Sequence, residues 1–369
     1  MQVLLGLMLI GALFLAFSNG ANDNFKGFAT VWGSHSLSYR RALTLATIAT
    51  VAGSLASVLL AHGLVQQFSG KGLVPDSMAS SQGFIASVAI GAAAAVMTAT
   101  RIGMPVSTTH ALLGALIGSG LASGWSTINL GALGGSFLLP LLVSPVMASV
   151  MGVTVYSLVR RVRPEIDCAC VVQDQSLSIS HEAAAVARFA AVPSLLAAPM
   201  EKCERMPGIV VRLAIPAALN RIHVLSASAI CFARGVNDTP KLAALLVAAG
   251  SVSSQGSAAL IAVAMGLGGV LLARRVAETM SLKINHLDNA QGISANLITA
   301  VLVIFASKWG LPVSTTHVSV GSISGVGARA GTLEWPALRA VLLSWVATLP
   351  FAAASAWAAA MLLGPAGLQ

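Results

Sequence analysis

Apolar residues occur along this chain in long runs that are separated by short polar segments. Runs of this length with helical spacing predict transmembrane helices, because the strands of a membrane β-barrel would alternate polar and apolar residues. The sequence therefore predicts an all-α polytopic membrane protein. The apolar runs cover residues 3–17, 42–62, 84–100, 104–122 and 130–159, and then 209–233, 242–272, 293–307, 311–328 and 337–363.

Composition and charge support this class. Of 369 residues, 56% are hydrophobic and only 9% are charged, whereas a soluble domain has about 25% charged residues. The net charge of +9 does not indicate nucleic-acid binding, because no basic stripe is interleaved with aromatic residues. Pairs such as Arg40/Arg41 and Arg274/Arg275 lie between apolar runs, as is typical of cytoplasmic loops. We expect a lipid bilayer, and no nucleic acid, as a partner.

One extended polar segment divides the chain. We predict a first membrane repeat at 1–160, a cytoplasmic central loop at 161–207 and a second membrane repeat at 208–369. The central loop contains Cys168, Cys170 and Cys203, without a CxxC spacing or a histidine at metal-site distance. This pattern favours reduced cytosolic thiols over a metal or redox site. We therefore predict no metal site.

The two halves of the chain share motifs in the same order. The segment Gly20–Lys26 (GANDNFK) matches Gly235–Lys241 (GVNDTPK) at an offset of 215 residues, and Gly103–His110 (GMPVSTTH) matches Gly310–His317 (GLPVSTTH) at an offset of 207. Because chance does not reproduce both motifs in order, the sequence indicates an internal duplication.

The positive charges predict that the two repeats have opposite orientations. If Arg40/Arg41 and Arg160 are cytoplasmic, the first half begins outside, ends inside and crosses the membrane an odd number of times. Arg274/Arg275 is then cytoplasmic only if the second copy is inverted. Inverted repeats with interrupted helices that meet at a midplane site are typical of secondary transporters. We predict a multi-pass protein of the cytoplasmic (inner) membrane with both termini outside.

Asp23 and Asp238 each lie in an apolar setting, where an ionised carboxylate is costly and usually faces a cavity or a partner. Each follows an Asn and precedes a Lys by three residues, a spacing that places Asp and Lys on one helix face. Each pair could simply stabilise a packed helix, but its recurrence in both halves favours a site. The first set of predicted site residues is Asn22, Asp23, Lys26, Asn237, Asp238 and Lys241.

The repeated Pro-Val-Ser-Thr-Thr-His segment supplies a second set. Pro105 and Pro312 are expected to interrupt their helices. Hydroxyl residues that open the following helix lie beside free amides and the positive end of the helix dipole, which together can bind an anion. Plain helix capping is the alternative for these residues. For His110 and His317, a hydrogen-bond donor role in helix packing is favoured over proton handling or gating. The second set is Ser107, Thr108, Thr109, Ser314, Thr315 and Thr316.

These motifs resemble those of the PiT family of inorganic phosphate transporters over nearly the whole chain apart from the central loop. The resemblance rests on Gly-Ala-Asn22-Asp23, Gly-Val-Asn237-Asp238 and the doubled Pro-Val-Ser-Thr-Thr-His. It implies a carrier that moves inorganic phosphate with Na⁺ or H⁺ and has no other cofactor. It also implies that the Asn-Asp and Ser-Thr-Thr residues bind phosphate and the coupling ion, with Asp23 and Asp238 as the coupling-ion residues.

The chain departs from the family at Lys26 and Lys241, where the usual motif has Asn. A fixed ammonium at this place could stand where a relative has a bound cation, so the sequence favours a proton over Na⁺. We expect Arg101 and Lys308, just before the helix breaks, to supply part of the remaining positive charge. A permease for sulfate or another oxyanion, an anion channel and an intramembrane enzyme are the alternatives. The enzyme is disfavoured because its candidate nucleophile and base, within Ser107–His110, have no third group to orient them. The sequence leaves open whether the protein forms a homodimer.

Overall fold

The computed structural model describes residues 2–160, 167–173, 193–207, 209–248, 252–284 and 287–364. The chain forms two compact units, of which one combines Met1–Ser157 with His223–Gln369 and the other is Leu158–Ile222. Residues 161–166 and 174–192 of the predicted central loop lie outside the described residues.

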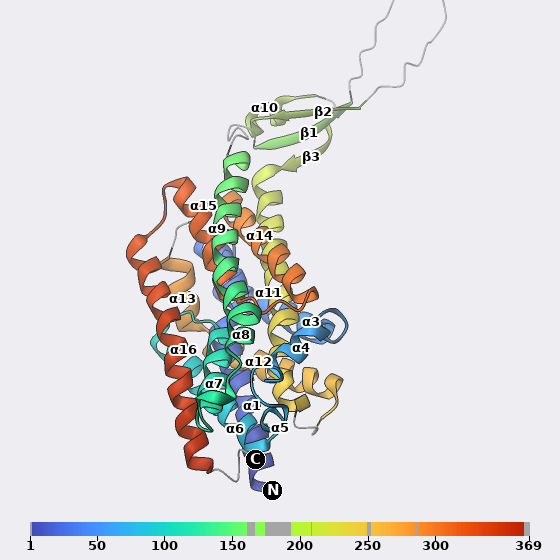
Figure 1. Cartoon of the computed structure of the whole chain (residues 1–369). Coiled ribbons are helices and arrows are strands. Elements are labelled where there is room, and N and C mark those ends of the chain that lie inside the picture. Colours follow the sequence, from blue (N-terminus) through green and yellow to red (C-terminus); the bar gives the residue numbers. More distant parts are fainter. Residues whose placement is uncertain are drawn as a thin grey trace, which may run out of the picture. The chain divides into compact units, whose positions relative to one another are not determined.

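The described part of the larger unit is helical (Figure 1). Its first half consists of α1 (Gln2–Asp23), the 3₁₀ turn η1 (Lys26–Phe28), α2 (Ala29–Gly33), α3 (Tyr39–Leu60), α4 (His62–Phe68), α5 (Asp76–Ala79), α6 (Gln82–Ile102), α7 (Thr108–Leu121), the 3₁₀ turn η2 (Trp125–Thr127), α8 (Leu130–Ala132), the π-helical η3 (Leu133–Leu138) and α9 (Leu139–Val159). Its second half consists of α11 (Ile215–Ala248), α12 (Ser254–Leu272), α13 (Arg274–Leu282), α14 (Asn289–Lys308), α15 (Thr315–Ala330) and α16 (Trp335–Leu363). The apolar run predicted at 242–272 is thus divided between α11 and α12.

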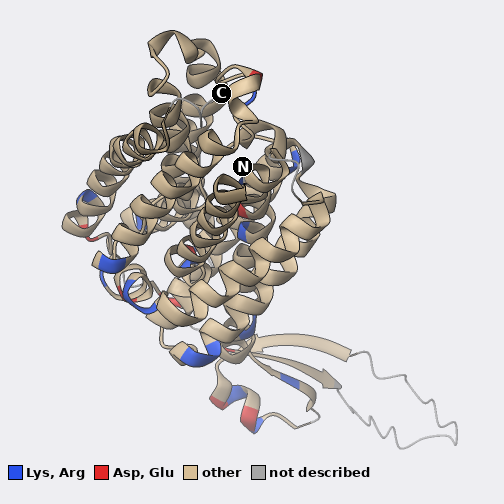
Figure 2. Cartoon of the chain, turned by 90° about the horizontal axis from the view of Figure 1, so that it is seen from below, with Lys and Arg blue, Asp and Glu red and all other residues tan. Residues whose placement is uncertain are grey.

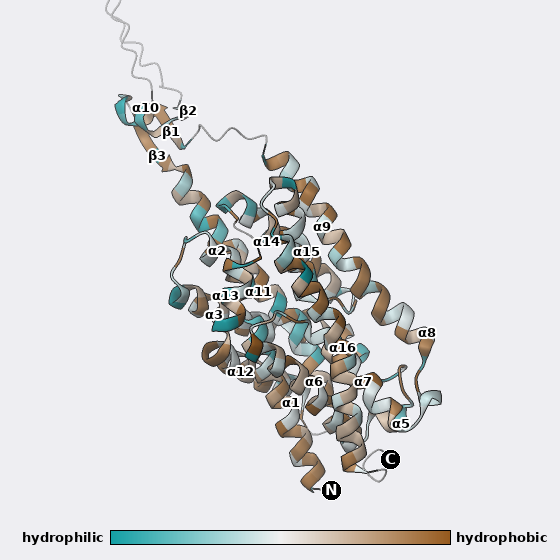
Figure 3. Ribbon diagram, turned by 90° about the vertical axis from the view of Figure 1, so that its left-hand side faces the viewer, coloured by the Kyte–Doolittle hydropathy of each residue, from teal (hydrophilic) through white to brown (hydrophobic). Residues whose placement is uncertain are grey.

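Eight helical segments within the described residues are long and apolar enough to cross a membrane. Their ribbons are mostly hydrophobic (Figure 3), and charged residues are sparse on them (Figure 2). Helices α7 and α15 are only 14 and 16 residues long, whereas a full span needs about 20 residues. Each follows a longer helix after a short break and runs back antiparallel along it, because Ser87 of α6 contacts Ser119 of α7 and Thr299 of α14 contacts Ser322 of α15. The apolar runs are therefore broken near the predicted prolines, and each pair of helices is a hairpin.

Glycines allow the two halves to pack closely against each other. A Cβ atom on Gly20 of α1 would lie 1.9 Å from the carbonyl oxygen of Met265 in α12, and one on Gly235 of α11 would lie 2.3 Å from that of Thr50 in α3. Gly20 and Gly235 are 215 residues apart in the sequence, and so are their partners Thr50 and Met265. The contact between α1 and α12 therefore has an exact counterpart between α11 and α3, with the halves exchanged.

The same exchange occurs around the second motif. A Cβ on Gly114 of α7 would lie 2.3 Å from the carbonyl oxygen of Leu349 in α16, and one on Gly321 of α15 would lie 2.4 Å from that of Pro145 in α9. Close helix contacts through small residues are common in membrane proteins. Each half therefore packs its short helix against the last long helix of the other half.

The ends of the long helices show how the chain runs through the larger unit. The start of α1 and the end of α16 lie at the same end of the bundle, and the end of α9 lies at the opposite end (Figures 1 and 3). The first half therefore begins and ends at opposite ends of the bundle. This arrangement agrees with the odd number of crossings that the positive charges predicted.

The smaller unit contains strands that the sequence analysis did not predict. It consists of β1 (Cys168–Gln173), β2 (Pro193–Ala198), α10 (Met200–Arg205) and β3 (Ile209–Ala214). The sheet has the order β2-β1-β3, and both pairs are antiparallel. The apolar run predicted from residue 209 was wrong at its start, because 209–214 form β3 and the membrane helix begins only at Ile215.

Candidate functional site

The first Asn-Asp motif closes α1. The helix ends at Asp23, and the chain turns through Asn24 and Phe25 into η1, which begins at Lys26. The Lys26 Nζ atom lies 2.5 Å from Asp23 Oδ1, and both side chains are buried. The predicted pair therefore forms, but through a tight turn rather than along one face of a continuous helix.

The second Asn-Asp motif lies within α11, which continues through Asp238, Pro240 and Lys241. The Lys241 Nζ atom lies 3.5 Å from Asp238 Oδ1, and both side chains are buried. In this half the three-residue spacing along the helix places the two charges together, as predicted.

The helix breaks lie where the prolines predicted them. Helix α6 ends at Ile102 and is followed by Gly103 with a φ of +75°, and α7 begins after Ser107. The Ser107 hydroxyl accepts a hydrogen bond from the His110 backbone amide at 3.1 Å. In the second half, the Ser314 hydroxyl caps α15 in the same way at 3.3 Å. Both serines are therefore helix caps, and each keeps its own hydroxyl proton for another acceptor.

The asparagines connect the Asn-Asp motifs to the breaks. Asn22 donates to the carbonyl oxygen of Met104 at 3.0 Å and accepts from the amide of Val106 at 3.1 Å. Asn237 donates to the carbonyl oxygen of Val313 at 3.4 Å. Each asparagine thus satisfies backbone groups that the break leaves without helical partners. Their observed contacts position the two breaks.

Lys26 makes contacts to both halves of the chain. Besides Asp23, its ammonium group donates to the carbonyl oxygen of Val106 at 2.8 Å and to the hydroxyl of Thr316 at 2.6 Å. Val106 belongs to the break of the first half and Thr316 to α15 of the second half. Thr316 in turn donates to the Val106 carbonyl at 2.9 Å.

Lys241 repeats this pattern with the halves exchanged. Besides Asp238, its ammonium group donates to the carbonyl oxygen of Val313 at 2.7 Å and to the hydroxyl of Thr109 at 2.9 Å. Thr109 donates to the Val313 carbonyl at 3.3 Å. Because an ammonium group has three donors, these contacts use the full capacity of each lysine.

These contacts bring the N-terminal ends of α7 and α15 together. The rings of His110 and His317 lie with their centroids 4.4 Å apart, and the His317 ring stacks on Trp345 at 3.8 Å. Asn19 connects the two halves further, because its amide donates to the Thr108 hydroxyl at 2.8 Å and to Asp238 Oδ2 at 3.4 Å. Two helix N-termini in one place concentrate positive potential suited to an anion. The histidine rings pack at this junction, but His110 Nδ1 and both ring nitrogens of His317 have no hydrogen-bond partner among the described residues, so the expected packing hydrogen bonds are not found at these nitrogens.

All of the predicted site residues are buried and contribute to this one region. Their exposed fractions do not exceed 6%. They are Asn22, Asp23, Lys26, Ser107, Thr108, Thr109, Asn237, Asp238, Lys241, Ser314, Thr315 and Thr316.

Arg234 is a residue of this region that the sequence analysis missed. Its side chain is 1% exposed, and Nη2 lies 3.5 Å from the Thr50 hydroxyl. The Nε and Nη1 atoms are buried without a hydrogen-bond partner among the described residues. The guanidinium interacts electrostatically with Asp23 and Lys26. The repeat itself carried the signal, since Arg234 occupies the position that Asn19 holds 215 residues earlier.

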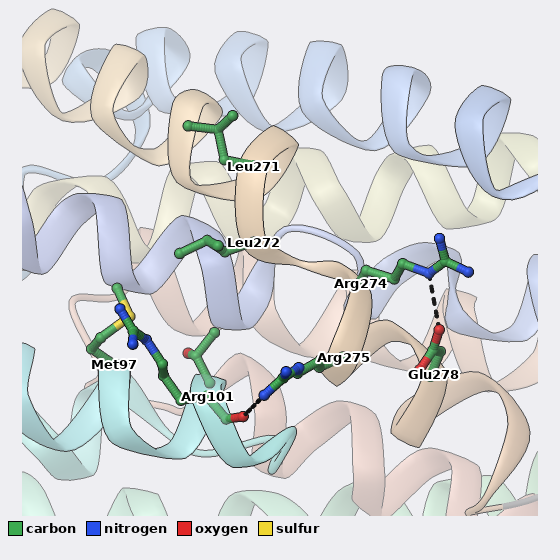
Figure 4. Close-up of a pocket in the computed structure, with 8 residues that line it drawn as sticks. Met97, Arg101, Leu271, Leu272, Arg274, Arg275 and Glu278 are labelled. Atoms are coloured by element: carbon green, nitrogen blue, oxygen red, sulfur yellow. Dashed lines mark hydrogen bonds and ion pairs between the residues drawn. The ribbon is translucent and has the colours of Figure 1, made fainter.

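Arg101 and Lys308 lie elsewhere than expected. Both side chains are exposed, so they do not contribute charge inside the buried region. Arg101 lines a pocket of about 670 Å³ between α6, α12 and α13 (Figure 4), together with Arg274 and Arg275. Thr100, which also lines the pocket, accepts a hydrogen bond from Asn22 at 3.0 Å. Glu278 also lines the pocket and pairs with Arg274 at 3.0 Å, which leaves Arg101 and Arg275 as its unbalanced positive charges. A pocket with net positive charge therefore adjoins the buried motif residues.

Comparison with known proteins gives a consistent family. Residues 19–356 match the model of the phosphate transporter family. The chain is 26% identical to inorganic phosphate transporter 2-1 of Arabidopsis thaliana chloroplasts, over 94% of this chain and 70% of the relative. It is 25% identical to a Bacillus subtilis protein named "Probable low-affinity inorganic phosphate transporter", over 94% of this chain and 93% of the relative.

A solved structure shows the same fold. The structure titled "The sodium-dependent phosphate transporter" aligns with a TM-score of 0.74 and 24% sequence identity. The alignment covers 98% of this chain and 99% of that one.

Proposed function

Because the chain belongs to the phosphate transporter family, we propose that it is a secondary active carrier that moves inorganic phosphate across the cytoplasmic membrane with a cation. The substrate site is the buried region where the two breaks meet, and the coupling ion is a proton rather than Na⁺. The two repeats have inverted topology, with both chain termini outside.

The observation that carries this proposal is the pair of buried ammonium groups in matching oxygen cages. Each cage consists of an Asp carboxylate, a backbone carbonyl and a Thr hydroxyl from the opposite half. Hard oxygen ligands of this kind also suit Na⁺. Lys26 and Lys241 therefore occupy oxygen cages that would otherwise suit a mobile cation, and the chain carries its two cations covalently.

The charges of the buried region favour a monovalent anion. Asp23 and Asp238 are each balanced by their lysine, and Arg234 adds one further positive charge. An uncompensated charge inside a membrane is costly, so a substrate with a single negative charge fits best. Monobasic phosphate has this charge, and it equals dibasic phosphate plus one proton. Sulfate stays divalent at neutral pH and would leave the site negative.

Arg234 is the residue best placed to distinguish an occupied from an empty site. Its two unpartnered nitrogens are buried, where a missing hydrogen bond is costly. A phosphate oxygen would satisfy them. The amides that open α7 and α15 are further donors for an anion in this buried region. The hydroxyls of Ser107 and Ser314 are the further donors of this site.

The arginine-lined pocket is a route by which phosphate reaches the site. Positive charge in a recess raises the local concentration of anions, and Thr100 connects the pocket to Asn22. Because Arg274 and Arg275 follow the positive-inside rule, this pocket opens to the cytoplasm.

Uptake into proteoliposomes tests the proposal. We expect labelled phosphate to enter in choline medium when an inward proton gradient is imposed, and to enter faster when phosphate is present inside. Equal uptake of labelled sulfate would contradict phosphate selectivity. Uptake that responds neither to the gradient nor to internal phosphate would indicate a channel and contradict the carrier.

A further inference from the structure

Three cysteines meet in the smaller unit, Leu158–Ile222. Cys168 and Cys170 alternate along β1 and therefore point to the same face of the sheet. Helix α10 supplies Cys203, which lies 33 residues beyond Cys170. All three side chains are completely buried, and none forms a disulfide.

The three sulfur atoms lie within ligand distance of a common centre. Each Sγ lies within 4.8 Å of the others, and those of Cys170 and Cys203 are 2.9 Å apart. Zn–S bonds of about 2.3 Å with tetrahedral angles place sulfur atoms roughly 3.8 Å apart. If the Cys203 sulfur moved about an ångström away from that of Cys170, their separation would match that of two ligands of one metal ion. The backbone of β1 would not need to move.

Among its described residues, the smaller unit buries few apolar side chains. Its three strands and its helix contain six residues each. Among its described residues, the fully buried core consists of the three cysteines and Ala198, with side chains such as Leu196 and Met200 packed around them. Small domains with few buried apolar residues are commonly stabilised by disulfides or a metal. The three thiols lie at the centre of this unit, where a bound metal ion would stabilise it.

We propose that Cys168, Cys170 and Cys203 bind one thiophilic d¹⁰ metal ion, Zn²⁺ or Cu⁺, that holds α10 against the sheet. The ligating group contains only sulfur among the described residues, which selects soft metals over Mg²⁺ or Ca²⁺. The side chain of Met200 packs against the cluster and adds a thioether, another soft group, to its surroundings. The predicted absence of a metal site rested on the spacing in sequence, which the sheet and α10 overcome by folding.

The neighbourhood of the cluster fixes the geometry that such a site needs. The Asp167 side chain accepts from the Met200 amide and so anchors the start of α10. Arg212 of β3 donates to the carbonyl oxygen of Cys203 at 3.4 Å.

Metal analysis of the purified full-length chain tests this inference. We expect close to one zinc or copper ion per chain in the wild type, and loss of that metal in the triple variant Cys168→Ser/Cys170→Ser/Cys203→Ser. Cys231→Ser is the matched control, because Cys231 is the remaining cysteine and lies in α11 of the larger unit. This control should retain the full metal content.

A second measurement does not depend on the folding of the triple variant. Wild-type protein is stripped with a chelator, and Co²⁺ is added under reducing conditions. Thiolate-to-cobalt charge-transfer bands that disappear when Zn²⁺ is added would support a soft tetrahedral site, and bathocuproine competition would identify a Cu⁺ site instead. Metal no higher than in the triple variant, the absence of both cobalt thiolate bands and copper that bathocuproine can compete for, or a Cys170–Cys203 disulfide in the protein as purified would overturn the inference.

Discussion

Exchanging both buried lysines for asparagine tests whether they replace mobile cations. In Lys26→Asn/Lys241→Asn, each oxygen cage loses an ammonium group that makes three hydrogen bonds. Removing one partner of a buried ion pair costs about 3–5 kcal/mol. We therefore expect a clear loss of thermal stability in choline medium, and loss of phosphate uptake.

Sodium should reverse part of this loss. The vacated cages retain the carboxylate, carbonyl and hydroxyl ligands that suit Na⁺. A cation present at 100 times its dissociation constant stabilises the folded state by about 2.7 kcal/mol, which recovers a large part of one lost pair. The double variant should therefore regain stability and uptake when choline is replaced by Na⁺ at constant pH.

The assay compares phosphate uptake and melting temperature in Na⁺ and in choline. Lys71→Asn is the matched control, because Lys71 is exposed, and it should behave as wild type in both media. Wild-type uptake that collapses in choline would refute the reasoning, since the lysines would then not replace the cation. A double variant that is as stable and as active as wild type without Na⁺ would refute it equally.

Further variants test the carboxylates, the caps and the topology. Asp23→Asn and Asp238→Asn should each reduce uptake to background in a folded protein, and uptake near wild type would remove them from the site. Ser107→Ala should raise KM for phosphate about tenfold or more, because a hydrogen bond to a charged group is worth about 1.5–3 kcal/mol; an unchanged KM would leave only capping. Lys71→Cys should label from outside. Glu201→Cys, whose parent side chain is 74% exposed, should label only from inside, and the reverse pattern would contradict the inverted topology.

The helix breaks and the paired motifs were predictable because their causes are local. Proline removes a backbone donor, so Pro105 and Pro312 mark breaks in any apolar run that contains them. The duplication showed that Asp23 and Asp238 occupy equivalent positions in the two halves. These features needed only the order of residues along the chain.

The exchange of contacts between halves needed three dimensions. Sequence spacing placed Lys26 near Asp23, but its bond to Thr316 depends on how the two short helices meet. Identical residues in the two halves could not identify Arg234, because the equivalent position in the first half is Asn19. Positions at which a repeat departs from symmetry therefore merit the same attention as positions at which it is exact.

The central segment was the least predictable part. Strands of six residues give a weak signal, and the apolar residues of 209–214 are equally typical of the start of a membrane helix. Cys203 joins Cys170 only because α10 folds over β1, at a separation that no metal-binding motif in sequence would indicate.

Binding of labelled phosphate to the purified protein in choline medium tests the central claim most directly. The wild type should bind phosphate with sulfate as a poor competitor, and Arg234→Gln should weaken binding at least about tenfold, because a charged donor to the anion is lost. Arg101→Gln, which changes an exposed arginine of the pocket, should bind nearly as wild type at equilibrium. Phosphate binding that is absent in the wild type, or unchanged in Arg234→Gln, would contradict a phosphate site at the junction of the two breaks.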